Sequence, residues 1–203
     1  MNSPFDARPI VVAVAGPNGA GKTTFYEAHL RPAGLRSVNA DELARELGLD
    51  AYKSAELAGR LRETLLEQGE SFVFETVFSD PVGDEIGFLK KASARGYTVV
   101  LCFIGIDGPS VSEERVSMRV LQGGHDVPSR KLRERYPRTQ RNLAVAIREL
   151  PHVLVYDNGD LRRPFRKVAE FEAGKMVDQH APLPRWLSRL PRWLSRAIAI
   201  SRR

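Results

Sequence analysis

The residues with the clearest chemical meaning form a glycine-rich loop near the start of the chain. Residues 16–23 read Gly-Pro-Asn-Gly-Ala-Gly-Lys-Thr and match the pattern G-x-x-x-x-G-K-[ST]. Glycines at these positions let the backbone curl around a phosphate, so that successive N–H groups point at the anion. Lys22 would contact the β- and γ-phosphates of a nucleotide, and the hydroxyl of Thr23 would bind Mg²⁺. The loop therefore predicts a site for a nucleoside triphosphate and magnesium.

The segments on either side of this loop, the P-loop, have the pattern that such a site requires. Residues 9–15 are apolar and rich in β-branched side chains, as in a buried strand. Residues 23–30 suit a helix that ends near Pro32. A strand, a loop and a helix in this order place the loop at the positive end of the helix. This context argues against a chance match in a glycine-rich turn.

Two carboxylates follow later strand-like segments and are candidates for work on a second substrate. Asp41 follows the short strand candidate 36–39 and is either a base that accepts a proton from an attacking hydroxyl or a helix N-cap. Its position favours neither interpretation. Glu75 interrupts the apolar strand candidate 71–77, where an unpaired buried carboxylate would be costly. We favour a functional partner for Glu75 (Mg²⁺-bound water, an arginine or a substrate hydroxyl) over a structural ion pair.

An arginine-rich segment at about residues 110–137 could supply the positive charge that phosphoryl transfer requires. Arg115 and Arg119 are four residues apart and share one face of the expected helix. The pair Gly123-Gly124 permits a hinge, so the segment could close over phosphates as a lid. The alternative is a solvated helix whose arginines pair with nearby glutamates. We favour the lid.

The order of strands and helices indicates the fold class. The strand candidates are residues 9–15, 36–39, 71–77, 97–104 and 152–156. Helical segments lie between them; one is expected to begin at Asp80-Pro81 and another to cover residues 138–150. This alternation predicts an α/β three-layer fold, with a parallel sheet of about five strands and helices on both faces. Ligands in such sheets bind beyond the carboxyl ends of the strands, where the P-loop, Asp41 and Glu75 fall.

Composition limits the other possibilities. The single cysteine, Cys102, lies in an apolar run, which excludes a disulfide framework and a cysteine metal site. Residues 1–8 lack the apolar core of a signal peptide, and no stretch is apolar enough to cross a membrane, so a cytoplasmic location is the default. Residues 181–203 hold six arginines and no acid; without them, 25 basic residues balance 25 acidic ones. The net charge of +6 therefore does not predict a nucleic-acid-binding face on the domain.

We expect a domain over residues 1–180 and a basic tail over residues 181–203. Within the tail, Pro-Arg-Trp-Leu-Ser-Arg occurs at 184–189 and again at 191–196, and its apolar side chains fall on one helical face. A basic amphipathic segment with tryptophans can lie on an anionic membrane or bind a partner. The alternative, which we favour, is a tail that is disordered or packs on its own domain.

The motifs also discriminate among classes of P-loop protein. A GTPase should carry N-K-x-D, which the sequence lacks, and the D-x-x-G match at residues 84–87 follows no strand candidate. A transporter-type ATPase should be longer and carry an L-S-G-G-Q-like signature. A small-molecule kinase fits a short chain with an acid after the second strand and an arginine lid. A regulator that binds ATP without chemistry is the alternative from another class.

Taken in order, these motifs resemble the zeta toxin family, and more narrowly its short bacterial branch, often labelled predicted ABC-type ATPases. The resemblance implies a kinase that uses ATP and Mg²⁺ to phosphorylate a hydroxyl of UDP-N-acetylglucosamine or a related UDP-sugar, which blocks synthesis of cell-wall precursors. A kinase of another nucleotide or sugar is the alternative. The resemblance spans about residues 9–160 and depends on residues 16–24, 39–42, 74–79, 119–127, 135–136, 141–143 and 156–158.

The resemblance implies roles for individual positions. Lys22 and Thr23 match the nucleotide and Mg²⁺ residues, and Asp41 matches the base that activates the sugar hydroxyl. Glu75 and Thr76 match the substrate-side acid and its neighbour. The nucleotide-binding residues that we expect are Gly16, Pro17, Asn18, Gly19, Ala20, Gly21, Lys22, Thr23, Thr24 and Asn158.

The lid and the partners are assigned less completely by the resemblance. Arg119 lies where a catalytic lid arginine is expected, and the second such arginine is Arg115, Arg133 or Arg135, with Arg133 and Arg135 as substrate-binding candidates. Toxins of this kind are often held by a small helical antitoxin, separate or fused. Because only residues 1–8 precede the first strand, we expect any antitoxin to act in trans.

Overall fold

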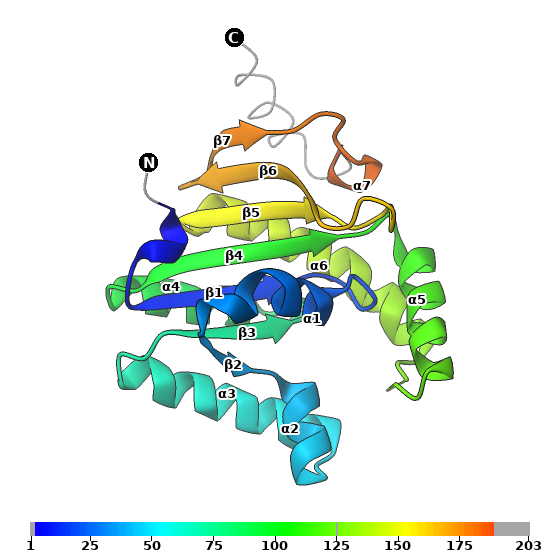
Figure 1. Ribbon diagram of the computed structural model, residues 1–203, viewed down its shortest axis with the longest axis horizontal. Coiled ribbons are helices and arrows are strands. Elements are labelled where there is room, and N and C mark those ends of the chain that lie inside the picture. The colour runs from blue at the N-terminus through cyan, green and yellow to red at the C-terminus, as the bar shows by residue number, and fades with distance from the viewer. Residues whose placement is uncertain (1–2, 125, 189–203) are drawn as a thin grey trace.

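The computed structural model describes residues 3–124 and 126–188, and its centre is a single sheet (Figure 1). β1 (Ile10–Ala15) pairs in parallel with β3 (Phe72–Thr76) on one side and β4 (Thr98–Gly105) on the other. β2 (Arg36–Val38) and β5 (His152–Asp157) extend this parallel part at its two ends. The five strands that the sequence predicted are confirmed, as is the α/β class of the fold.

The sheet contains seven strands rather than about five, because a hairpin extends it beyond β5. β6 (Arg166–Glu172) and β7 (Lys175–Gln179) both run antiparallel to their neighbours, in the strand order β2-β3-β1-β4-β5-β6-β7. Charged side chains dominate this edge; Lys167, for example, forms an ion pair with Asp178 across the hairpin at 3.1 Å. A strand with so many charges lacks the apolar pattern by which the other five were predicted.

Both faces of the central strands are buried, which makes the fold three-layered. Side chains alternate along β1, so that Val11 and Ala13 face the larger core while Ile10 and Val12 face the smaller one. α4 and α6 cover one face in Figure 1, and α1 covers the other. Burial on both faces explains the continuous apolar sequence of the parallel strands. The helices are α1 (Lys22–Phe25), α2 (Ala40–Leu47), α3 (Ala51–Glu67), α4 (Asp84–Ala94), α5 (Pro109–Leu121), α6 (Ser129–Glu149) and α7 (Arg185–Ser188).

Two helices begin elsewhere than the sequence predicted. α4 begins after Gly83 and not at Asp80; the Asp80 carboxylate instead accepts the backbone N–H of Asp84 at 2.7 Å. α6 begins at Ser129 and runs through Pro137. Buried side chains on both sides of the proline, among them Leu132 and Thr139, hold the two parts of α6 against the domain. Tertiary packing therefore overrides the helix-breaking tendency of this proline.

The part of the predicted tail that the structure describes lies against the domain. α7 buries Trp186 and Leu187, with 2% and 1% of their surfaces exposed, in the larger core. Residues 189–203, which include the second copy of the repeat and much of the proposed membrane-binding face, lie outside the described residues. Among the residues described, no helix combines the length and the apolar character needed to cross a bilayer.

Candidate active site

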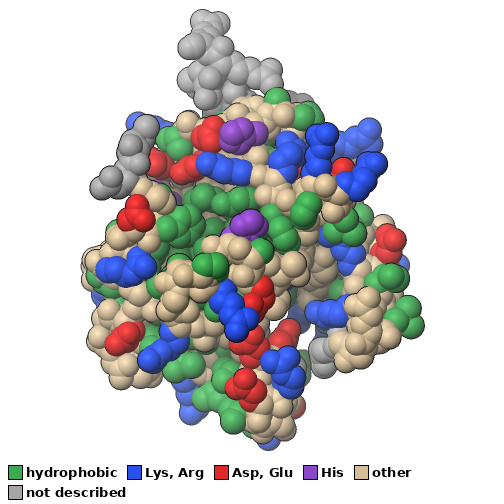
Figure 2. Space-filling model, viewed as in Figure 1, with side chains coloured by type: hydrophobic (Ala, Val, Ile, Leu, Met, Phe, Trp, Pro, Cys, Tyr) green, Lys and Arg blue, Asp and Glu red, His purple; other side chains and the backbone are tan. Residues whose placement is uncertain are grey.

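A pocket of about 710 Å³ lies at the carboxyl ends of the parallel strands, where the sheet topology predicts a ligand site. Figure 2 shows the hollow between α5 and the part of the molecule that carries α2. The P-loop, β3, α3 and the lid helices α5 and α6 all contribute to its wall. The predicted site residues that line it are Asn18, Gly19, Gly21, Lys22, Thr23, Thr24, Asp41, Glu75, Thr76, Arg115, Arg119 and Arg135.

The other predicted residues lie outside the lining of this pocket. Gly16, Pro17 and Ala20 belong to the P-loop but do not line the pocket. Asn158 is buried and donates from Nδ2 to the carbonyl of Ala20 at 2.9 Å, so it supports the loop from behind. Arg133 forms an ion pair on the surface with Glu113 at 2.5 Å. Of the three candidates for a second lid arginine, Arg115 and Arg135 therefore reach the pocket and Arg133 does not.

The P-loop requires glycine at three positions. Gly16, Gly19 and Gly21 have φ angles of 148°, 75° and 86°, which other residues rarely adopt. A Cβ atom on Gly16 would lie 2.2 Å from the carbonyl oxygen of Ile104, and one on Gly21 would lie 2.8 Å from Nδ2 of Asn158. The loop is thus shaped as a narrow backbone cradle, and this geometry fits a phosphate group.

Lys22 provides the cation of the cradle. Its Nζ donates to the carbonyls of Gly16 at 3.0 Å and Pro17 at 3.2 Å, so the side chain lies across the P-loop. Burial lowers the pKa of Lys22, and the nearby Glu75 and Asp41 carboxylates partly offset this effect. A buried cation of this kind gains from an anionic ligand, which the cradle is shaped to receive.

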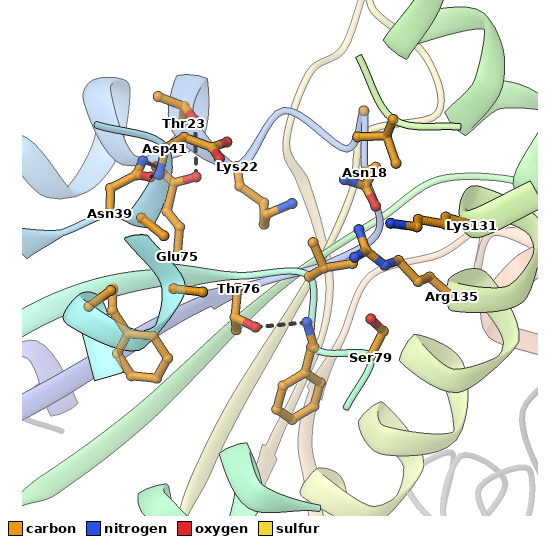
Figure 3. Close-up of a pocket in the computed structure, with 18 of the residues that line it drawn as sticks. Asn18, Lys22, Thr23, Asn39, Asp41, Glu75, Thr76, Ser79, Lys131 and Arg135 are labelled. Carbon is orange, nitrogen blue, oxygen red and sulfur yellow. Dashed lines mark hydrogen bonds between the residues drawn. The ribbon is translucent and has the colours of Figure 1, made fainter. Parts of the chain in front are cut away.

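Glu75 and Thr23 connect the P-loop to β3. The Thr23 hydroxyl donates to Oε2 of Glu75 at 3.0 Å, and Asn39 Nδ2 donates to Oε1 at 3.0 Å. Burial raises the pKa of Glu75, and the positive charge of Lys22 counteracts the rise. In Figure 3, Thr23, Asn39, Asp41 and Glu75 lie together on one side of the pocket.

Asn39, and not Asp41, is the N-cap of α2. Oδ1 of Asn39 accepts the backbone N–H of Asp41 at 2.9 Å. Capping therefore does not account for the aspartate, whose side chain is instead part of the pocket lining. Of the two interpretations that the sequence left open, the N-cap is wrong, and the role of Asp41 as a base stays a prediction.

The lid helices dock on the P-loop and on the far side of the pocket. The hydroxyl of Ser112 on α5 donates to the carbonyl of Asn18 at 2.6 Å. Arg115 donates to the carbonyls of Asn158 at 2.8 Å and Gly19 at 3.4 Å. Arg135 on α6 lies opposite the carboxylates in Figure 3. Positive side chains from two helices therefore face a pocket whose other wall carries acids.

Sequence reasoning missed several charged residues that line the pocket, among them Arg62 and Glu85. Arg62 on α3 stacks over Phe74, with Cζ 4.5 Å from the ring centroid. Glu85 on α4 accepts the Thr76 hydroxyl, and burial together with the nearby Asp80 carboxylate raises the pKa of Glu85 to about 7. Both residues belong to helices whose sequences read as ordinary amphipathic surfaces, so no local pattern marked them.

The donor atoms near the P-loop fit a magnesium–nucleotide complex. Thr23, Asp41 and Glu75 present a hydroxyl and two carboxylates, and oxygen atoms are the ligands that Mg²⁺ prefers. No cluster of three or more histidines, cysteines and acids that could hold a metal alone occurs among the described residues.

Fold and site together define a P-loop protein of the kinase-like type. The family model described as Zeta toxin matches residues 50–167, which is more than half of the chain. The chain belongs to the zeta toxin family. A comparison with curated proteins finds no match.

Solved structures with the same fold include a chain of a protein complex and a chain of a toxin–antitoxin system. A chain from the AvrRxo1-ORF1:-ORF2 complex with ATP is 19% identical, with a TM-score of 0.57, and the match covers 84% of this chain and 60% of that one. A chain of the PezAT chromosomal toxin–antitoxin system of Streptococcus pneumoniae is 16% identical (TM-score 0.58; 96% and 84% covered). A putative kinase from Chloroflexus aurantiacus is 19% identical (TM-score 0.56; 77% and 92% covered). The present chain thus spans about three fifths of the AvrRxo1-ORF1:-ORF2 chain.

Proposed function

We propose that the protein is an ATP-dependent kinase that phosphorylates a hydroxyl of a small molecule. The observation that carries this proposal is the shared pocket: Lys22 and Thr23 of the P-loop lie on the same cavity as the Asp41 and Glu75 carboxylates and Arg119 of the lid. A nucleotide-binding regulator would need the P-loop but not an acid aimed at an acceptor. Membership of the zeta toxin family supports the kinase interpretation.

Each residue has a defined task in this proposal. The P-loop amides and Lys22 hold the phosphates of ATP, and Arg119 offsets the negative charge that spreads over the transferred group. Asp41 orients the acceptor hydroxyl and accepts its proton as the oxygen attacks the γ-phosphorus, the bond from that phosphorus to the bridging oxygen breaks, and ADP leaves. Thr23, with Glu75 hydrogen-bonded to it, would hold Mg²⁺. When bound, the ion neutralises charge on the phosphate oxygens.

For the acceptor, we propose a UDP-sugar such as UDP-N-acetylglucosamine. The family supports this choice, and the floor of the pocket, with Arg62, Glu85 and Thr76, offers hydrogen-bonding groups to a polar acceptor beyond the phosphate cradle. A partner that restrains the enzyme in trans is consistent with a similar fold in a toxin–antitoxin system.

The test is direct phosphate transfer. The protein is incubated with Mg²⁺-ATP and, one at a time, with UDP-sugars, nucleosides, free sugars and NAD, and mass spectrometry detects an added phosphate. Asp41→Asn should abolish transfer and leave ATP affinity within about twofold, because the amide keeps the shape of the side chain but cannot take the proton.

The neighbouring Glu42→Gln is the matched control, since Glu42 does not line the pocket. It should retain wild-type transfer. Binding of ATP without transfer to any acceptor would favour a non-catalytic regulator, and full activity of Asp41→Asn would remove Asp41 as the base.

A further inference from the structure

The first tryptophan of the C-terminal repeat is joined to the strand that ends beside the P-loop. Nε1 of Trp186 donates to Oδ1 of Asp157, the last residue of β5, at 2.9 Å. The indole ring also packs against Gly105 at the end of β4, where an added Cβ would lie 2.0 Å from the ring. The ring and its N–H therefore fix the ends of two neighbouring strands.

These strand ends hold the residue that supports the P-loop. The backbone N–H of Asn158, the residue after Asp157, donates to the carbonyl of Gly105 at 2.9 Å. Nδ2 of Asn158 donates to the carbonyl of Ala20 within the P-loop, and its own carbonyl accepts from Arg115 of the lid at 2.8 Å. A short series of contacts thus runs from α7 through Asp157 and Asn158 to both the P-loop and the lid.

We infer that Trp186 is a positioning residue of the nucleotide site. By holding Asp157 and Gly105, it fixes Asn158, and Asn158 fixes the P-loop backbone that binds the phosphates of ATP. The inference rests on the proposed ATP binding, and it gives the first copy of the repeat a role in that site.

A purely structural role for Trp186 would have a different signature. Leu187, the next residue of α7, is equally buried in the same core, and its only hydrogen bond in the described structure is the backbone bond to Pro184. Removal of either side chain should lower stability through lost packing. If the inference is right, only changes at Trp186 should also alter the P-loop and its affinity for ATP.

The test compares Trp186→Phe, Trp186→Leu and the matched control Leu187→Ala. Trp186→Phe keeps an aromatic ring on Gly105 and removes the N–H donor, so ATP affinity measured by calorimetry should fall about threefold to tenfold. Trp186→Leu should weaken it further. Leu187→Ala should lower the melting temperature while the dissociation constant for ATP stays within about twofold.

Hydrogen exchange without ATP provides a second measurement. The amides of Ala20 and Gly21 should exchange faster in both Trp186 variants than in wild type and in Leu187→Ala, because local opening becomes easier. Unchanged exchange at these amides, or equal acceleration in Leu187→Ala, would overturn the inference.

The two proposals can fail separately. A wild-type protein that fails to bind ATP would refute the proposed function, and the exchange measurement would still decide the role of Trp186. If Trp186→Leu does not fold, the comparison of Trp186→Phe with wild type decides alone.

Discussion

The Thr23 hydroxyl donates to the Glu75 carboxylate over 3.0 Å, which joins the P-loop to β3. The parallel register explains why these residues meet. Val14 pairs with Glu75 and Ala15 with Thr76, so β3 ends level with the start of the P-loop. Two residues that are far apart in sequence therefore form one element of the site, with Lys22 close enough to influence the pKa of Glu75.

Glu75→Gln should slow phosphate transfer while the fold stays intact. The substitution keeps the size of the side chain and lets an oxygen accept from Thr23, but it removes a negative charge from the site of Lys22 and the proposed magnesium. We expect the rate of phosphate transfer to fall by about 10²-fold or more, with circular dichroism unchanged. Single-turnover measurements with the acceptor found in the panel would check this. Wild-type rates in the variant would exclude Glu75 from the reaction.

The lid arginines should differ according to whether they face the pocket. Arg119 lines it, so Arg119→Ala should reduce kcat by about 10²- to 10³-fold through lost stabilisation of the transferred phosphate. Arg133 does not line the pocket and pairs with Glu113 on the surface, where an ion pair contributes little to stability. Arg133→Ala should therefore leave kcat within about twofold. Steady-state kinetics of both variants would show the contrast. Comparable losses in the two would refute a lid assignment based on the pocket lining.

The buried parallel strands and the P-loop could be predicted from sequence because their signals are local. A run such as Val11–Val14 is apolar on both faces, and the spacing of glycines in the P-loop reflects backbone shape directly. The hairpin of β6 and β7 could not, since its charged residues pair with one another at an edge of the sheet. Local patterns predict a strand only when burial dictates its composition.

For the site, the sequence could predict only which residues follow a strand and so lie at the carboxyl end of the sheet. That rule brought Asp41 and Glu75 to the right end of the sheet. It could not show that Asn39 caps α2, or that Arg62 and Glu85 reach the pocket from helices that begin elsewhere, because these contacts depend on tertiary packing.

The contact between Gly105 and Trp186 predicts opposite effects of two glycine substitutions. A Cβ on Gly105 would lie 2.0 Å from the indole ring, so Gly105→Ala should destabilise the protein by at least about 1–3 kcal/mol through overpacking. Gly87 lies within α4 with no atom within 4 Å of an added Cβ, so Gly87→Ala should stabilise by about 0.5–1 kcal/mol. Urea denaturation would measure both. A neutral Gly105→Ala would contradict the observed packing of Trp186.

Glu85 should make the stability of the protein fall between mildly acidic and neutral pH. Burial raises the pKa of this carboxyl group from 4.5 to about 7 in the folded state. Between these values the folded chain binds more protons than the unfolded chain, so the free energy of unfolding decreases as the pH rises and levels off above about 7. In Glu85→Gln the side chain is neutral at every pH and can still accept the Thr76 hydroxyl, so the free energy of unfolding of this variant should not show this decrease.

Urea denaturation of wild type and Glu85→Gln at pH 4.5, 6 and 8 would check this dependence. The variant should gain relative to wild type by about 1–3 kcal/mol between the lowest and the highest pH. Glu56→Gln, which alters an exposed ion pair with Arg60 on α3, should follow wild type within about 0.5 kcal/mol throughout. Parallel curves for wild type and Glu85→Gln would mean that Glu85 has the same pKa in the folded and the unfolded chain. A positive group, with Arg62 the nearest candidate, would then compensate its burial.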